Sequence, residues 1–359
     1  MKIKALITFF LLLNVAFAIS QTHTVTDAQQ KLIAESLKSF PVETQVSFAF
    51  IENGVVTFYG LKQEKDSMVP VSNYRNNFEI GSITKVFTST LLADFVLEGK
   101  VKLDDPINDY IGIPLRDSIR ISFKQLANHT SGLPRMPSNF AVTAMLSTNN
   151  PFKNYDAGKL KKYLADELRL DSEPGRNSVY SNLGAGLLGY VLCEIADQDY
   201  ETLLQRYIFS KYSMINSTTL RDKIAQQLVK GLNAKGEETP NWDLSVLIAA
   251  GGILSTVEDL SKFALAQFDP TNKELELTRV KTWMNPAGLD IGLGWHFVKS
   301  KIGAEWPWHN GGTGGYTSSM AMDIGRRNAI ILLTNISSYH SNSKRIDELC
   351  FALMKTLKQ

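Results

Sequence analysis

The chain has 359 residues, of which 44% are hydrophobic and 21% charged. This composition is typical of a globular protein and excludes collagen, a coiled coil and wholesale disorder. The chain has 38 lysine and arginine residues and 36 aspartate and glutamate residues. This near-neutral balance lacks the excess of basic residues that is typical of nucleic-acid-binding proteins. The length fits two domains or one large domain with an insertion.

The first residues of the chain have the pattern of a leader peptide. Two lysines among the first four residues precede an apolar run over residues 5–18, which is too short to span a bilayer and ends in small residues. Cleavage after Ala18 and after Ser20 both fit this pattern. We therefore expect residues 1–20 to be a secretory signal peptide, and the mature protein to be periplasmic or secreted with no stable membrane anchor.

Helix and strand patterns alternate in the next part of the chain. Apolar residues at helical spacing predict a helix over 27–40. The β-rich runs on both sides of Asn53-Gly54 predict a hairpin over 46–60, because Asn-Gly fits a tight hairpin turn. A second helical pattern covers 82–98 and stops at Gly99, which places Ser82 at a helix start.

Helical patterns dominate the middle of the chain and strand patterns its C-terminal part. A capping box of Ser255 and Glu258 is expected to start one of the helices. The expected helices cover 159–169, 182–196, 260–268 and 344–357, and the expected strands 294–299, 316–322 and 329–335.

This order of patterns predicts an α+β fold. Strands at both ends around a helical middle imply one sheet assembled from both termini and flanked by helices, with a large helical insertion. We expect a sheet domain made of residues 21–99 and 286–359 and a helical region over 100–285.

The sharpest chemical signal is Ser82-Ile-Thr-Lys85. A serine that opens a helix and a lysine three residues later share one face, so the amine lies near the hydroxyl and can take its proton if burial lowers the lysine pKa. The unpaired N–H groups of the helix start can stabilise an oxyanion. The pattern is weak alone, because Ser341-Asn-Ser-Lys344 also matches it and there reads as a solvated cap.

Two further segments carry groups of the same chemistry. Tyr180-Ser-Asn182 places a phenol and an amide where a loop enters a helix, although Tyr74-Arg-Asn76 matches the same pattern and a tyrosine packed against a carbonyl is the plain alternative. The glycine-rich segment 308–316 contains His309, and its glycines allow a strand to approach a ligand closely. A flexible turn is the alternative for that segment.

Neither a cofactor nor a metal is expected. Gly184-Ala-Gly-Leu-Leu-Gly189 matches a dinucleotide-binding pattern but follows no buried strand, so we expect its glycines to allow a close helix contact instead. The histidines His129, His296 and His309 lack the spacing of a zinc site.

Together, and in this order, the three motifs resemble the Ser-x-x-Lys, Tyr-x-Asn and Lys/His-x-Gly motifs of the serine β-lactamase and penicillin-binding-protein family, in its class C-like branch. The segments 126–134, 249–256 and 292–295 are also similar, and the resemblance covers about residues 46–336. It implies the β-lactamase/transpeptidase-like fold with an antiparallel sheet.

The resemblance also implies a role for each matching residue. Ser82 would be the acylated nucleophile, and Lys85 and Tyr180 would share the proton transfers, with the choice of base between them left open. Asn182 would bind the substrate's acyl side-chain amide. His309 would line the opposite wall, beside the backbone of Gly311 and Gly312. The N–H groups of Ser82 and Gly312 would form the oxyanion hole.

One residue differs from the family pattern, and this difference limits what the resemblance implies about the substrate. Dedicated class C β-lactamases usually carry lysine where His309 stands, and a histidine of ordinary pKa, about 6.5, would bind a substrate carboxylate weakly or in a pH-dependent way. The expected substrate is therefore a small molecule or peptide, either a β-lactam, a D-amino-acid peptide or an ester. The competing hypothesis is a catalytically silent peptidoglycan-binding or sensor domain of the same fold.

Overall fold

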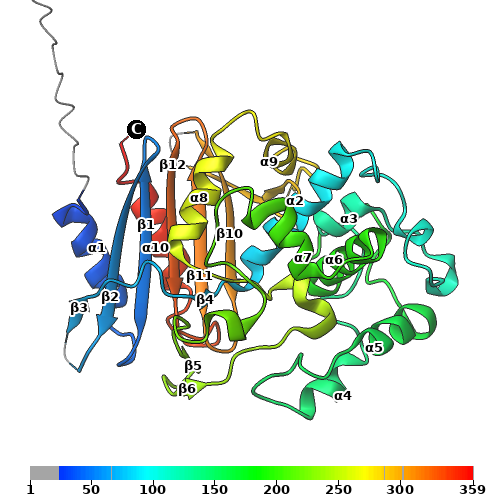
Figure 1. Ribbon diagram of the computed structural model, residues 1–359, viewed down its shortest axis with the longest axis horizontal. Coiled ribbons are helices and arrows are strands. Elements are labelled where there is room, and N and C mark those ends of the chain that lie inside the picture. Colours follow the sequence, from blue (N-terminus) through cyan, green and yellow to red (C-terminus); the bar gives the residue numbers. More distant parts are fainter. Residues whose placement is uncertain (1–23, 66, 287, 301–302, 359) are drawn as a thin grey trace, which may run out of the picture.

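The structure is a computed structural model that describes residues 24–65, 67–286, 288–300 and 303–358. The signal peptide predicted at residues 1–20 lies outside these ranges. An eight-stranded antiparallel sheet stands beside a group of helices (Figure 1). Its strands are β1 (Gln45–Glu52), β2 (Val55–Gln63), β3 (Met68–Pro70), β8 (Asp290–Ile291), β9 (His296–Lys299), β10 (Glu305–Gly312), β11 (Thr317–Asp323) and β12 (Asn328–Thr334).

The sheet joins the two ends of the chain, as the sequence predicted. The strand order is β3-β2-β1-β12-β11-β10-β9-β8, so the N-terminal strand β1 pairs with the C-terminal strand β12, with Val46 opposite Thr334. The predicted hairpin is confirmed, because β1 and β2 turn at Asn53 and Gly54, which both have positive φ.

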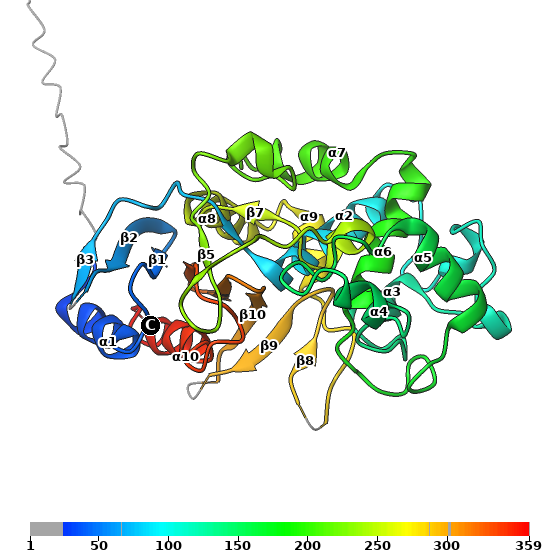
Figure 2. The ribbon, with the colours of Figure 1, turned by 90° about the horizontal axis from the view of Figure 1, so that it is seen from below.

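Helices cover both faces of the sheet and fill the region beside it. They are α1 (Asp27–Leu37), α2 (Thr84–Leu97), α3 (Phe123–Ala127), α4 (Phe140–Met145), α5 (Ala157–Lys162), α6 (Asn182–Ala196), α7 (Tyr200–Leu204), α8 (Val257–Gln267), α9 (Lys273–Thr278) and α10 (Arg345–Met354). In Figure 2, α1 and α10 lie on one face of the sheet and α8 on the other. β12 is buried along its whole length because it is covered on both sides.

Two short strand pairs lie outside the main sheet. One pairs β4 (Phe78–Glu79) with β7 (Leu254–Ser255), and the other pairs β5 (Gly231–Leu232) with β6 (Glu238–Thr239). No helix in the described ranges is both long enough and apolar enough to cross a membrane.

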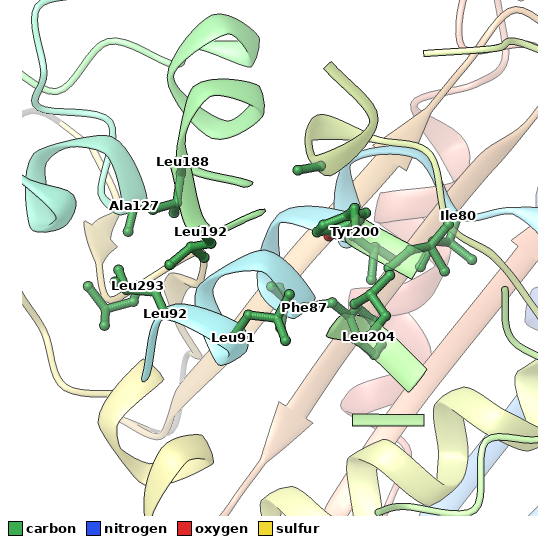
Figure 3. Close-up of a cluster of buried hydrophobic side chains, with 14 of the residues drawn as sticks. Ile80, Phe87, Leu91, Leu92, Ala127, Leu188, Leu192, Tyr200, Leu204 and Leu293 are labelled. Atoms are coloured by element: carbon green, nitrogen blue, oxygen red, sulfur yellow. The ribbon is translucent and has the colours of Figure 1, made fainter. Parts of the chain in front are cut away.

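Helix α2 forms the centre of the core between the sheet and the other helices. Its side chains Phe87, Leu91 and Leu92 are fully buried. Figure 3 shows α2 between side chains of α6, such as Leu188, and side chains of α7, such as Tyr200. This packing holds the start of α2, which directly follows the turn that carries Ser82.

Two glycines of α6 allow a close contact that reaches the same region. A Cβ added at Gly189 would lie 2.0 Å from the Cβ of Ala249, and one at Gly186 would lie 2.6 Å from a methyl of Leu247. The prediction that these glycines serve helix packing is confirmed. The contact holds the 3₁₀ segment Ser245–Ala250 against α6.

The predicted N-cap of α8 was wrong by one residue, and the helix begins at Val257 rather than at the predicted residue 260. Thr256, in an extended conformation, is the N-cap and accepts a hydrogen bond from the backbone N–H of Asp259. Ser255 instead belongs to β7, and its hydroxyl pairs with that of Ser217. The strand pairing of β7 therefore takes the residue that the capping-box pattern had assigned to the helix.

Candidate functional site

Ser82 lies in a 3₁₀ turn, Gly81–Ile83, that leads directly into α2. Gly81 has a φ of +52°, and a Cβ there would lie 2.6 Å from the backbone nitrogen of Gly312. A Cβ at Gly311 would lie 1.9 Å from the carbonyl oxygen of Ile80. Glycine at these positions thus allows the end of β10 to lie against the Ser82 turn, as the glycine-rich segment predicted.

Lys85 is buried beneath this turn with only 2% of its surface exposed. Its Nζ donates to Oδ1 of Asn182 at 2.9 Å and to the carbonyl oxygen of Ala250 at 2.7 Å, and it lies 3.1 Å from Oγ of Ser82. Burial, aided by the nearby charge of Arg135, holds the pKa of Lys85 well below its usual value of 10.5. A neutral amine in this position can accept the proton of the serine hydroxyl.

Tyr180 lies on the other side of the amine. Nζ of Lys85 is 4.8 Å from the centre of its ring, and the guanidinium of Arg135 is 5.1 Å from the same point. Burial raises the pKa of Tyr180 to about 12, although a hydrogen bond with Ser82 and the charge of Arg135 both act to lower it. The side chain is therefore a neutral phenol at pH 7 and can donate a proton.

The start of α6 positions Asn182. Ser181 caps the helix through a hydrogen bond from the N–H of Gly184 to its hydroxyl oxygen at 2.9 Å. The N–H of Asn182 itself donates to the carbonyl oxygen of Arg135 at 3.0 Å. The amide of Asn182 thereby meets Lys85, as the sequence predicted for two parts of one site.

His309 is almost fully buried in β10, with 1% of its surface exposed. Its Nδ1 lies 2.6 Å from the carbonyl oxygen of Asn310, which assigns the proton to Nδ1. Burial, together with the nearby His296 and Lys85, holds its pKa well below 6.5. The expectation of an ordinary histidine pKa was wrong, because that expectation took no account of burial.

Sequence reasoning missed three basic residues that lie in this site. The ring of His129 is 4.5 Å from that of Tyr180, the ring of His296 is 5.4 Å from that of His309, and Arg135 lies over Tyr180. Nδ1 of His129 also accepts a hydrogen bond from the N–H of Ser181 at 3.3 Å. The segment 126–134, which carried part of the family resemblance, ends next to Arg135 and was the available signal.

The arrangement brings together groups that can support nucleophilic chemistry. Within the described ranges, no group of three or more His, Cys, Asp or Glu side chains could hold a metal ion. Ser82, Lys85, Tyr180 and Asn182 lie together, and β10 brings His309, Gly311 and Gly312 beside them. A half-buried hydroxyl beside a buried amine and a neutral phenol is the chemistry of acyl transfer.

Comparisons with known proteins identify a family for this chain. The family model for beta-lactamases matches residues 42–349. A beta-lactamase of Pseudomonas fluorescens is 26% identical over 266 residues, which cover 72% of this chain and 70% of the relative. The D-alanyl-D-alanine-carboxypeptidase/endopeptidase AmpH of Escherichia coli K12 is 27% identical over 297 residues, which cover 75% of this chain and 74% of the relative.

A solved structure shares the fold. The D-alanine carboxypeptidase AmpC from Burkholderia cenocepacia superposes with a TM-score of 0.76 over 92% of this chain and 98% of that one, at 21% sequence identity. The predicted fold class, an antiparallel sheet flanked by helices with a large helical insertion, is confirmed.

Proposed function

The chain belongs to the beta-lactamase family, and on that premise we propose that it is a serine hydrolase in which Ser82 attacks an amide, β-lactam or ester carbonyl and forms an acyl-enzyme. The observation that carries this proposal is the buried amine of Lys85, 3.1 Å from the Ser82 hydroxyl. A hydroxyl becomes a good nucleophile only when a neighbouring base removes its proton as the bond forms.

In the first step, Oγ of Ser82 bonds to the substrate carbonyl carbon while its proton passes to the pair formed by Lys85 and Tyr180. The same pair then delivers a proton to the leaving nitrogen or oxygen as its bond to the carbonyl carbon breaks. The depressed pKa of Lys85 supports its neutral form at pH 7, and the raised pKa of Tyr180 supports a phenol that donates.

We propose that the backbone N–H groups of Ser82 and Gly312 bind the oxyanion formed in this step. Two features support the assignment. Ser82 stands at the entry to α2, where backbone N–H groups are free of helical partners, and the close approach of Gly81 to Gly312 brings the second N–H beside it. Asn182, His309 and Gly311 would bind the rest of the substrate.

In the second step, water attacks the acyl-enzyme, its proton passes to the same pair, and Ser82 leaves with a proton restored. The substrate is a small molecule or a peptide. A β-lactamase, a D-peptide hydrolase and an esterase all use these steps, and the relatives include proteins named for the first two activities. We further propose, from the leader at residues 1–20, that the reaction takes place outside the cytoplasm.

The experiment that tests the proposal is covalent labelling. Incubation with a fluorescent penicillin or an activated phosphonate, followed by mass mapping of peptides, is expected to place the adduct on Ser82. Labelling that persists in Ser82→Ala would overturn the assignment.

A second measurement identifies the substrate class. Nitrocefin, D-alanyl peptides and short-chain nitrophenyl esters are compared by kcat/KM on the wild-type protein, with Ser82→Ala as the background. The class with the highest ratio over that background identifies the activity. No turnover of any of them, together with no labelling, would favour a catalytically silent domain.

A further inference from the structure

His129 lies next to Tyr180 in a backbone conformation that most residues avoid. It follows Asn128, the C-cap of α3, its φ is +61°, and only 3% of its surface is exposed. Nε2 of its ring is buried and has no hydrogen-bond partner among the described residues. A left-handed backbone and an unpaired buried nitrogen both lower stability, and residues with such features are typical of functional sites. His129 is therefore a candidate for a role in the reaction.

His129 contacts the chain on both sides of Tyr180. Its carbonyl oxygen accepts a hydrogen bond from the N–H of Val179 at 2.8 Å. Its Nδ1 accepts a second hydrogen bond, from the N–H of Ser181 at 3.3 Å. Between these two bonds, the centre of the His129 ring lies 4.5 Å from the centre of the Tyr180 ring. One residue thus contacts the backbone before Tyr180, the backbone after it and its side chain.

Neighbouring hydrogen bonds hold His129 itself in place. Oδ1 of Asn128 accepts hydrogen bonds from the N–H of Thr130 at 3.2 Å and from its hydroxyl at 2.6 Å. Nδ2 of Asn128 donates to the hydroxyl oxygen of Thr282 at 3.1 Å. On the other side, the carbonyl oxygen of Thr130 accepts from the N–H of Gly175 at 2.7 Å. The turn that carries His129 is therefore anchored at both ends, so the histidine can act as a fixed support.

The hydrogen bond from Ser181 determines which nitrogen of the His129 ring carries the proton. Because a backbone N–H donates to Nδ1, this nitrogen presents its lone pair, and the proton of the neutral ring lies on Nε2. Burial, followed by the nearby charges of His296 and Lys85, holds the pKa of His129 well below 6.5. The ring is therefore neutral at pH 7 and keeps its acceptor on Nδ1.

We propose that His129 is a positioning residue that holds the phenol of Tyr180 in place beside Ser82. This inference rests on the proposed function, in which Tyr180 and Lys85 share the proton transfers. A proton passes efficiently only between groups within hydrogen-bond reach, and a misplacement of about 1 Å can slow a reaction about 10²-fold. In this role, the effect of His129 on the acylation of Ser82 passes through the hydroxyl of Tyr180.

The test measures acylation of Ser82 by a chromogenic β-lactam or an activated ester in stopped flow. His129→Ala removes the ring, and we expect acylation to slow about ten-fold to 30-fold, because the phenol is still present but poorly placed. In a Tyr180→Phe background, the same replacement should change the rate by less than about two-fold, because the hydroxyl that His129 positions is already absent. A general loosening of the fold would instead slow acylation equally in both backgrounds.

Two amide variants separate the two nitrogens of the His129 ring. His129→Asn places an amide oxygen near the position of Nδ1, and asparagine tolerates a positive φ, so acylation should recover to within about three-fold of the wild type. His129→Gln places its amide near the position of Nε2 and should remain about as slow as His129→Ala. If circular dichroism shows that His129→Ala does not fold, the asparagine and glutamine variants carry the comparison in both backgrounds.

His340→Ala is the matched control. Nδ1 of His340 also accepts a hydrogen bond from a backbone N–H, that of Asn342 at 3.1 Å, in the turn before α10. Its replacement should leave the acylation rate near that of the wild type.

Three results would overturn this inference and leave the proposed function standing. They are a wild-type rate in His129→Ala, an equal loss in the wild-type and Tyr180→Phe backgrounds, and equal rates in His129→Asn and His129→Gln. Absence of acylation in the wild type above the Ser82→Ala background would instead overturn the proposed function, and this inference with it.

Discussion

The pattern Ser-x-x-Lys occurs twice in the chain, and the two copies have different surroundings. At the start of α2, Lys85 is buried and its Nζ contacts Ser82, Asn182 and the carbonyl oxygen of Ala250. Before α10, Ser341 and Lys344 lie in an exposed turn. No hydrogen bond joins these two side chains in the described part of the chain.

The difference shows which surroundings the Ser-x-x-Lys pattern needs before its serine can react. Spacing places a serine and a lysine on one face in either case, but only burial makes the amine neutral. The burial of Lys85 comes from elements far away in sequence, namely α6 and the segment that ends at Ala250. A four-residue motif is therefore reactive only where the tertiary structure surrounds it.

Replacement of the two lysines gives the largest expected contrast. Lys85→Met keeps the volume of the side chain and removes the base, and it should slow acylation of Ser82 by about 10³-fold. Lys344→Met should change the rate by less than about two-fold. Stopped-flow acylation by a chromogenic β-lactam or ester measures both, with circular dichroism to verify folding. Equal rates in the two variants would remove Lys85 from the reaction.

The two Tyr-x-Asn matches extend the comparison to the proposed proton donor. Tyr180 meets Ser82, whereas the ring of Tyr74 stacks on Phe58 with the ring centres 4.8 Å apart. Tyr180→Phe keeps the ring and removes the hydroxyl, and acylation should fall about 10²-fold. Tyr74→Phe is the matched control and should leave the acylation rate near that of the wild type. A normal rate in Tyr180→Phe would contradict the proton-transfer role.

The comparison also explains which features the sequence could predict. The hairpin at Asn53-Gly54 and the helix over 182–196 depend on local turn chemistry and periodicity, and both were predicted correctly. The resemblance located Ser82, Lys85 and Tyr180 by motif. Burial and electrostatics depend on contacts between distant segments, which no local pattern encodes.

The missed residues illustrate this limit. His129 and His296 read as scattered histidines, because the sequence gives no sign that 4.5 Å separates the rings of His129 and Tyr180. Arg135 follows a familiar segment, but only the fold shows that it lies over Tyr180. The same limit explains the wrong expectation for the pKa of His309.

A pH profile tests the neutral state of His309. Because burial holds its pKa well below the ordinary value of 6.5, the imidazole should not change its charge as pH rises through 6.5. The ratio of kcat/KM for a carboxylate-bearing substrate over its neutral analogue should therefore stay flat between about pH 6 and 8. A fall in this ratio as pH rises through 6.5 would show that His309 titrates there and that its charge binds the carboxylate.

Asp94, further along α2, provides a half-buried ionisable group away from Ser82. Its Oδ2 is buried and has no hydrogen-bond partner among the described residues. Burial, with the nearby carboxylate of Glu274 as the next cause, raises its pKa to about 7. If burial of an ionisable group only lowers stability where no reactive side chains lie beside it, Asp94 should affect the stability of the fold and not catalysis.

The effect of Asp94 on the free energy of unfolding depends on pH, because its pKa differs between the folded and the unfolded chain. An aspartate in an unfolded chain has a pKa of about 3.9, so folding favours the neutral acid of Asp94. Ionisation of Asp94 therefore does not lower the stability of the folded protein below about pH 4. Its destabilising effect grows as pH rises and is complete above about pH 7. Asp94→Asn should therefore raise the free energy of unfolding by about 1–2 kcal/mol at pH 8 and by almost nothing at pH 4.

Denaturant unfolding of Asp94→Asn and wild type at both pH values measures this gain. Asp104→Asn is the control, because that carboxylate is exposed and pairs with Lys124, so its removal should give no such pH-dependent gain. Acylation of Ser82 should be unchanged in both variants. A stability gain with unchanged acylation would show that burial has different effects at the two ends of α2. At Asp94 it would only lower stability, whereas at Lys85, which contacts Ser82 and Asn182, it would support the proposed reactivity. A loss of acylation in Asp94→Asn would instead mean that the far end of α2 acts on the site.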